Sequence, residues 1–359
     1  MSLNRLLFCL LATGSLLGCD DDPPPDPEPF ESEYLDSGPL CEPLATDYFP
    51  GQEDSWPACE SADTGQYVPF DSNISTISRV ASFEAIATLL FDPTTDSTSD
   101  EFTEARLEYQ SAEGLGSRVD RRYDPHFTVP EGAGTECEDD VLEKYPDYCV
   151  GPAHLQPLLL AAFNAGIAGD QPRVQAAKIE AALLWFFYVS VHKESLTCGT
   201  SKIQDCDSSY AYYSGGEVDE SDEDALGFAR YLQEVAPDTH ARVWDGILAV
   251  HCWRENDNPS GIAADDARRD LARTQTDRAA FDGVISILRD RLNKFEASTG
   301  AEQAYYWAFV QTLAPVIYPA ADARDQSSAS ILRSEFAKTD TGTVDIDAIV
   351  TALDSITAC

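Results

Sequence analysis

The amino-acid sequence predicts an all-α protein, an irregular helical bundle that is stapled by disulfides and preceded by a disordered N-terminal tether. Apolar residues recur at the three- and four-residue spacing of a helix face in successive segments, and no alternating strand pattern of comparable length competes. Hydrophobic residues make up 43% of the 359 residues, which is enough for a real core. An even number of cysteines remains in the mature chain, as a disulfide framework requires.

The N-terminus has the pattern of a bacterial lipoprotein signal. After Arg5, an apolar run ends in Leu16-Leu17-Gly18-Cys19, which matches a lipobox. Residues 1–18 are therefore expected to be a signal peptide, and Cys19 is expected to become a lipidated N-terminus held in the membrane by several acyl chains. We expect a lipid-anchored location in the bacterial cell envelope, periplasmic or surface-exposed, in either membrane. The alternative is a general signal peptide that leaves Cys19 as an ordinary core cysteine.

Composition divides the mature chain into three parts. Residues 19–36 are rich in proline and acidic side chains, which predicts an extended tether between the membrane and the domain. Residues 37–75 combine proline, glycine, aromatic residues and two cysteines without clear periodicity, which indicates an irregular, disulfide-clipped segment. Residues 76–359 carry the helical patterns and are predicted to form the main domain.

Helices follow one another through this domain. The predicted ranges are 77–91, 101–115, 155–167, 174–195, 222–235, 239–253, 276–296, 301–317 and 344–357. The stretch 174–195 is the most hydrophobic, and its centre at 181–189 is apolar on every face, which predicts the central helix of the bundle. That apolar centre is too short to cross a membrane. The run 340–347 only faintly resembles a calcium-binding loop and is interpreted as a turn before the last helix.

The charge of the chain is strongly negative. Its 24 Lys and Arg stand against 63 Asp and Glu, a formal net charge of -39. Such a chain does not neutralise phosphate backbones, so nucleic acid is excluded as a partner, and the protein surface is not expected to dock on anionic lipid. Small cations are the natural partners. Alternatively, the acidity only keeps an exported protein soluble, as in a saline habitat.

The cysteines are interpreted as structural disulfides. Cys9 leaves with the signal peptide and Cys19 takes lipid, and no remaining pair has the CxxC spacing of a zinc or redox site. The eight that remain are Cys41, Cys59, Cys137, Cys149, Cys198, Cys206, Cys252 and Cys359. The simplest hypothesis pairs neighbours in sequence: Cys41 with Cys59, Cys137 with Cys149, and Cys198 with Cys206. Cys252 then meets Cys359 and ties the C-terminus to the body.

Candidate metal ligands gather around the end of the central helix. Phenolate, carboxylate and imidazole suit ferric iron, and a disulfide-clipped turn between Cys198 and Cys206 could hold them together. The predicted ligands are Glu180, His192, Glu194, Asp207, Tyr210, Tyr212 and Tyr213. The alternative is that the tyrosines are core aromatics with bonded hydroxyls, His192 is a satisfied polar cap, and the acids are solvated.

Other motifs offer less. His240 and His251 share a helix face but lie three turns apart, too far for one ion, and a core or solvent-facing role is expected for His240. The sequence contains no G-x-S-x-G elbow, no HExxH and no phosphate-binding glycine loop, so the protein is predicted not to be an enzyme. Two carboxylates that face each other across a cleft stay open as a candidate, because an acidic chain offers many.

The run 205–216, Asp-Cys-Asp-Ser-Ser-Tyr-Ala-Tyr-Tyr-Ser-Gly-Gly, follows a hydrophobic helix and precedes an acidic loop. In this context, from about residue 77 to 317, the chain resembles the algal low-iron-inducible periplasmic proteins, an iron-assimilating family related to phytotransferrins. The resemblance implies an exported, helical, disulfide-bearing protein that captures ferric iron for uptake or storage without catalysing a reaction. Bacterial imelysin-type proteins are also exported and helical, but their Gly-x-His-x-x-Glu signature is absent, since Glu194 follows His192 one residue too early.

Two further functions remain open beside metal binding. The first is a structural or interaction lipoprotein of the cell envelope, with neither metal nor catalysis. The second is an exported hydrolase.

Overall fold

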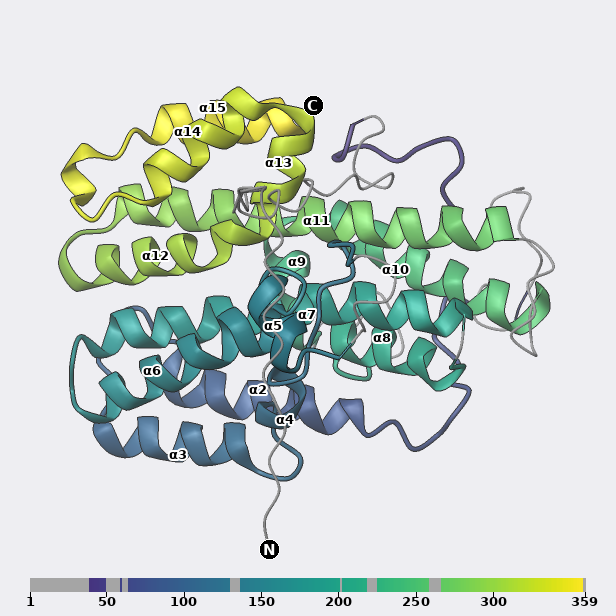
Figure 1. Ribbon diagram of the computed structural model, residues 1–359, viewed down its shortest axis with the longest axis horizontal. Helices are drawn as coiled ribbons and strands as arrows, with labels where there is room; N and C mark the ends of the chain where they lie inside the picture. Colours follow the sequence, from purple (N-terminus) through teal and green to yellow (C-terminus); the bar gives the residue numbers. More distant parts are fainter. Residues whose placement is uncertain are drawn as a thin grey trace, which may run out of the picture.

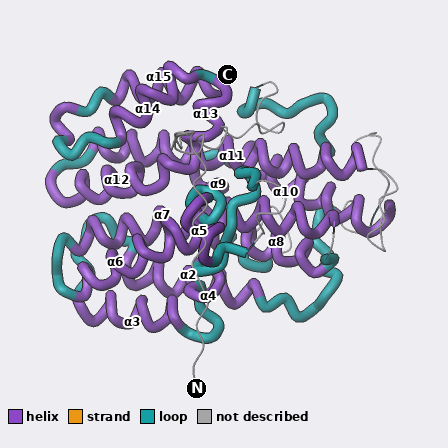
Figure 2. Tube along the Cα trace, in the orientation of Figure 1, coloured by secondary structure: helices purple, strands orange, loops and turns teal. Residues whose placement is uncertain are grey.

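The computed structural model describes residues 39–49, 59, 64–129, 136–200, 202–217, 225–257 and 266–357, and it confirms the all-α prediction. The described chain is made of helices and connecting loops and has no β-sheet (Figure 2). The predicted signal peptide, the lipidation site Cys19 and the tether 19–36 lie outside the described residues.

The helices range from a single turn to 32 residues. They are α2 (Thr76–Leu90), α3 (Ser99–Gln110), α4 (Gly116–Val119), α5 (Asp139–Lys144), α6 (Gln156–Ile167), α7 (Pro172–Thr200), α8 (Gln204–Ser214), α9 (Gly227–Val235), α10 (Pro237–Cys252), α11 (Asp266–Ala297), α12 (Gly300–Leu313), α13 (Tyr318–Arg324), α14 (Gln326–Phe336) and α15 (Ile346–Thr357). Short π or 3₁₀ turns occur at Gly151–Leu155, Trp253–Asp257, Ala314–Ile317 and Thr341–Thr343.

Helix α7 is the centre of the fold. It packs against α6, α8, α11 and α12, and Figure 1 shows α2, α3 and α6 on one side of it and α11 to α15 on the other. Within the described residues, its segment Pro172–Cys198 is long and apolar enough to cross a membrane by length and composition, but 89% of its most apolar window is buried inside the protein. This agrees with the prediction of a central core helix.

The helix boundaries differ from the predicted ones where polar residues hide the pattern. Helix α11 begins ten residues before the predicted start, because its first turns are polar and held by ion pairs from Arg269 to Asp266 and from Arg273 to Asp270. Helix α8 was not among the predicted helices, yet it is helical and almost entirely buried. Its all-round burial removes the amphipathic contrast on which a periodicity argument depends.

Two of the four predicted disulfide pairings are confirmed, and two are wrong. Cys137 bonds to Cys149, and Cys198 bonds to Cys206. Cys59, however, pairs with Cys252 across 193 residues, which excludes both Cys41–Cys59 and Cys252–Cys359. Pairing cysteines by their distance in sequence fails here, because the segment that carries Cys59 packs against the end of α10. Cys41 is also disulfide-bonded, while Cys359 lies outside the described residues.

Candidate metal centre

A polar cluster lies in the core where three parts of the chain meet. Asp124 and His126 come from the loop after α4, Tyr188 and His192 from α7, and Asp277 from α11, and all five are buried. Tyr188 and His192 are four residues apart, so they share one face of α7.

The loop that carries His126 is fixed by backbone hydrogen bonds. The amide of Asp124 donates to the Tyr148 carbonyl at 2.7 Å, and the amide of Gly151 donates to the Arg122 carbonyl at 2.8 Å. The amide of His126 itself donates to Oδ1 of Asp124 at 3.0 Å. The position of the imidazole is therefore set by the fold and by its neighbour two residues before it.

The ligand-type atoms of the cluster are close together. Asp277 Oδ1 lies 3.0 Å from His126 Nε2, 3.4 Å from His192 Nδ1 and 3.3 Å from the Tyr188 hydroxyl. That hydroxyl is also 3.3 Å from His126 Nε2. The two imidazoles are stacked, with ring centroids 3.9 Å apart. On its other side, His126 contacts Oδ1 of Asp124 through Nδ1 at 2.6 Å.

The surroundings give the two histidines opposite protonation states. Burial disfavours a charged imidazole, but Asp277 and Asp124 outweigh it and raise the pKa of His126 to about 10. Burial lowers the pKa of His192 to about 4 despite the attraction of Asp277. Burial alone would raise the pKa of Asp277, but the two histidines lower it to about 2. At neutral pH, His126 is therefore cationic, His192 neutral and Asp277 anionic.

Two atoms of this cluster are buried without a hydrogen bond. They are Nδ1 of His192, at 3.4 Å from Asp277 but outside hydrogen-bond geometry, and Oδ2 of Asp277. Buried polar atoms in proteins are nearly always hydrogen-bonded, so each such exception calls for a reason. A bound cation would engage both atoms.

The geometry of the cluster fits a metal ion. Ligand atoms at ~2.1 Å from one ion are about 3.0 Å apart in an octahedron and about 3.4 Å apart in a tetrahedron. The four separations above, which run from 3.0 to 3.4 Å, fall in this interval. Asp124, bonded to the opposite ring nitrogen of His126, is placed as the outer carboxylate that orients a metal-bound imidazole.

Of the seven ligands predicted from the sequence, His192 is the one that lies in this cluster. Glu180 is buried elsewhere on α7, where it accepts hydrogen bonds from Tyr231 at 2.7 Å, from Arg291 at 3.1 Å and from the hydroxyl of Tyr305. Glu194 pairs with Arg122 and with Lys193, both at 2.9 Å.

The residues of α8 have separate partners as well. Asp207 accepts hydrogen bonds from the Tyr67 hydroxyl at 2.9 Å and from two backbone amides of the loop that follows Tyr67. Tyr210 stacks on Tyr67 at 3.8 Å, and Tyr212 contacts Phe186 edge-on. Tyr213 places its hydroxyl 2.7 Å from Nδ1 of His240. The described structure thus divides the predicted set among several clusters.

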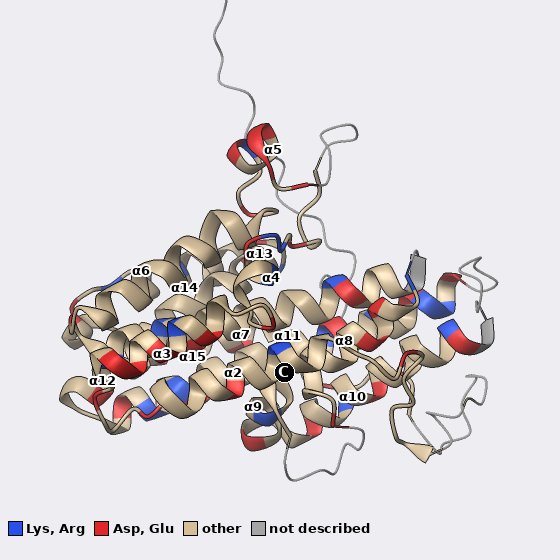
Figure 3. Ribbon diagram, turned by 90° about the horizontal axis from the view of Figure 1, so that it is seen from below, with Lys and Arg blue, Asp and Glu red and all other residues tan. Residues whose placement is uncertain are grey.

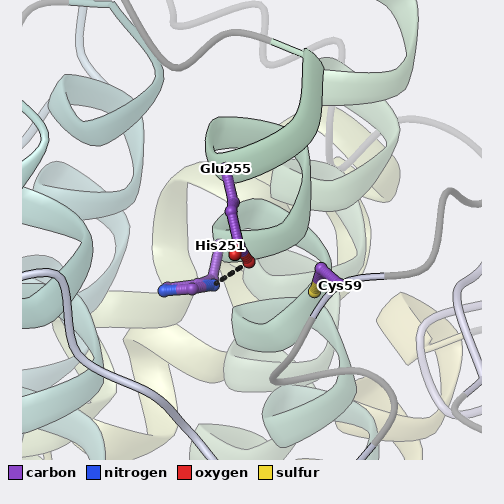
Figure 4. Close-up of side chains that lie close together, drawn as sticks. All are labelled: Cys59, His251 and Glu255. Atoms are coloured by element: carbon purple, nitrogen blue, oxygen red, sulfur yellow. Dashed lines mark ion pairs between the residues drawn. The ribbon is translucent and has the colours of Figure 1, made fainter.

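A second group of ligand-type side chains is formed by Cys59, His251 and Glu255 (Figure 4). His251 Nδ1 lies 3.9 Å from Glu255, as the dashed line shows, and its ring stacks on Phe70 at 4.1 Å. The sulfur of Cys59 is bonded to Cys252, so no thiolate is present to bind a metal. This group is a weaker candidate than the His126 cluster.

Sequence reasoning missed His126, Asp124, Tyr188 and Asp277 as ligands. Tyr188 and His192 are four residues apart in the predicted central helix, so the sequence already places them on one helix face. Asp277 stands in a run of α11 that is buried almost continuously from residue 272 to 285, and a carboxylate in such a run needs a partner. His126 lies in a loop without periodicity, so no sequence pattern points to it.

Comparison with family models, with curated proteins and with solved structures gives no match for this chain.

Proposed function

We propose that this chain is a lipid-anchored, extracytoplasmic helical protein that binds ferric iron for uptake or storage. The ligands are His126, His192, Asp277 and Tyr188, with Asp124 as the outer carboxylate. The observation that carries the proposal is the pair of buried atoms without hydrogen bonds, Nδ1 of His192 and Oδ2 of Asp277, in a cluster with metal-like spacing.

Charge favours a trivalent ion. Asp124 and Asp277 supply two negative charges, and ionisation of Tyr188 adds a third, so a ferric ion would leave the buried site neutral. Burial and Asp277 raise the pKa of Tyr188 well above its ordinary value, so its ionisation requires a strongly charged metal nearby. A phenolate, a carboxylate and two imidazoles form a donor set suited to iron.

The anchor rests on the sequence. The lipobox ending in Cys19 and the acidic, proline-rich tether support export and attachment to the envelope. A Cys19→Ser variant should lose acyl labelling and leave the membrane fraction. Membrane association that survives a carbonate wash in this variant would contradict the anchor, and it would leave the metal site untouched.

The test of the metal site compares two tyrosines. On ferric loading, wild-type protein should show one iron per chain and a visible tyrosinate-to-iron absorption band. Tyr188→Phe should abolish the band, because it removes the phenol oxygen and keeps the ring. Tyr213→Phe is the matched control, since its hydroxyl is also buried and also lies beside a histidine, His240.

The possible outcomes separate the hypotheses. A band that survives in Tyr188→Phe and disappears in Tyr213→Phe would move the site to α8. Calorimetry that detects no ferric binding by the wild-type protein would overturn the proposal. In that case the structural or interaction lipoprotein takes its place, with His126 held between Asp124 and Asp277 as a purely structural ion triad.

A further inference from the structure

An open cleft of about 1500 Å³ lies beside the candidate metal centre. Its walls come from α6 and α7 on one side, from α12 and α13 on the other, and from the segment around α5, which projects from the body of the protein (Figure 3). Typical small-ligand pockets measure ~300–1000 Å³, so this cleft is large enough for an organic molecule of substantial size.

The cleft reverses the charge balance of the chain. In the whole sequence, acidic residues outnumber basic ones 63 to 24, whereas the lining holds three carboxylates against four Lys and Arg and one His. All three carboxylates already have partners. Asp124 contacts His126, Asp147 lies 3.1 Å from His154, and Asp322 pairs with Arg333 at 2.6 Å. Lys144 and Arg333 are paired as well, with Asp140 and Asp322, so the formal balance of the lining is one positive charge.

Lys178 is the cation best placed to meet a ligand. It is half-buried on α7, and its ammonium group has neither an ion pair nor a hydrogen bond within the described chain. In a protein with a net charge of -39, a cation without a partner inside a cleft is unusual. A half-buried ammonium of this kind favours an anionic group that enters from solvent.

Trp185 contributes a small exposed apolar edge to the cleft wall, on the same face of α7. It follows Lys178 by seven residues, which is about 10 Å along the helix axis. Its ring is largely buried, and its indole N–H has no hydrogen bond in the part of the chain that the structure describes. Tyr148 and Phe127 also line the cleft. An anionic group and an aromatic body can thus be bound side by side.

We propose that this cleft binds an amphipathic organic anion, with its acidic group at Lys178 and its planar apolar part against Trp185. The proposal goes beyond metal binding and does not require it, although Asp124 belongs both to the cleft wall and to the cluster around His126.

Two fluorescent probes that differ chiefly in one charge test the proposal on the metal-free mature protein. The probes are 8-anilinonaphthalene-1-sulfonate and the uncharged N-phenyl-1-naphthylamine. The sulfonate should bind saturably at one site and at least about tenfold more tightly than the neutral probe, because a charge-assisted contact adds this much. Equal affinity for the two probes would overturn the role of charge.

Variants locate the probe. Lys178→Gln should weaken binding of the sulfonate about tenfold and leave binding of the neutral probe unchanged, since it removes only the charge. Lys202→Gln, at an exposed lysine outside the cleft lining, is the matched control and should bind like wild type. Because Lys178 has no partner to lose, the variant should fold normally, which circular dichroism can check. Unchanged sulfonate binding by folded Lys178→Gln would overturn the proposal.

A separate pair of variants tests the apolar half of the site. Trp185→Phe should weaken binding of both probes, whereas Trp307→Phe, outside the cleft, should affect neither. Inorganic phosphate at a concentration equal to that of the dye should not displace the sulfonate. Displacement by phosphate would show a simple inorganic anion site and would overturn the amphipathic assignment.

Discussion

Two buried carboxylate clusters lie on the same pair of helices, α7 and α11, and they are completed in different ways. Glu180 of α7 meets Arg291 of α11, while His192 of α7 meets Asp277 of α11. The two positions on α7 are 12 residues apart, about 18 Å along the axis. One cluster contains a permanent cation, and the other contains two imidazoles, of which His126 is cationic and His192 is neutral at neutral pH.

The difference separates a structural device from a candidate site. Around Glu180, both carboxylate oxygens accept hydrogen bonds, and the guanidinium of Arg291 cannot give up its charge. Around Asp277, one oxygen and one imidazole nitrogen have no hydrogen bond, and the charge depends on where protons sit. A saturated cluster fixes two helices relative to each other, whereas an unsaturated one still has binding capacity.

The largest expected effect is on stability at the Glu180 cluster. Glu180→Gln should lower the free energy of unfolding by about 3 kcal/mol, because it leaves the buried guanidinium of Arg291 without its main partner. Glu234→Gln is the control. The Glu234 side chain, which pairs with Lys294, is 62% exposed, so this substitution should change the free energy of unfolding by less than ~0.5 kcal/mol. Denaturant unfolding measures both. The folded Glu180→Gln variant should still bind ferric iron, because Glu180 is not a ligand of the candidate metal centre.

At the other cluster the order of effects should be reversed. Asp277→Asn should cost about 2 kcal/mol, because His126 can lose its proton when its partner loses its charge. Ferric binding, however, should fall below detection. Calorimetry measures ferric binding, and denaturant unfolding of the same preparation measures the free energy of unfolding. If Asp277→Asn destabilises the protein as much as Glu180→Gln and still binds iron, the two clusters are both structural.

Protonation gives a third way to distinguish them. The pKa of His126 is raised to about 10, above the ordinary value of 6.5, so its stabilising contribution is complete below pH 6.5 and is lost as pH rises towards 10. The stability difference between wild type and His126→Gln should therefore shrink steadily as pH rises from 6.5 towards 10. NMR of the five histidines offers a direct check. An imidazole of His126 that titrates near pH 6.5 would refute the ion triad.

The smallest effect is expected at Tyr188. Its hydroxyl makes only long contacts, 3.3 Å to Asp277 and 3.3 Å to His126, so Tyr188→Phe should cost less than ~1 kcal/mol. Tyr231→Phe, which removes a 2.7 Å donor to Glu180, should cost about 1.5 kcal/mol. Thermal unfolding of the two variants tests the order. The reverse order would place the tighter network around Asp277.

The fold was largely predictable because its core helices are long and apolar. Helix α7 was expected at 174–195 and runs over Pro172–Thr200, since a continuous apolar run admits few other structures. Helix α8 escaped prediction because Asp207 and the three tyrosines are buried together, so the segment shows no contrast between a polar and an apolar face. Helix α13 has only seven residues, too few for a periodicity argument, whereas α14 was missed although Ala329, Leu332 and Phe336 follow helical spacing.

The candidate site was much less predictable than the fold. His192 was identified because it lies near the end of the central helix, and helix geometry relates only residues within a few turns of one another. Asp277 lies 85 residues further along the chain and His126 lies 66 residues before, in segments that the fold alone brings together. The 11 residues of α8 looked richer in metal-ligand atoms than this cluster, but Asp207 is bonded to Tyr67 and Tyr213 to His240.

The Cys59–Cys252 bridge has a consequence for how the chain matures as it is made. Cys252 lies 193 residues after Cys59, so this bond can form only once both cysteines have reached the oxidising compartment. The two local disulfides can form earlier, because their cysteines are only 12 residues apart (Cys137 and Cys149) and 8 residues apart (Cys198 and Cys206). Early closure of the short loops removes four competing sulfurs before the long one forms. The two local disulfides thus leave fewer free thiols with which Cys59 or Cys252 could mispair.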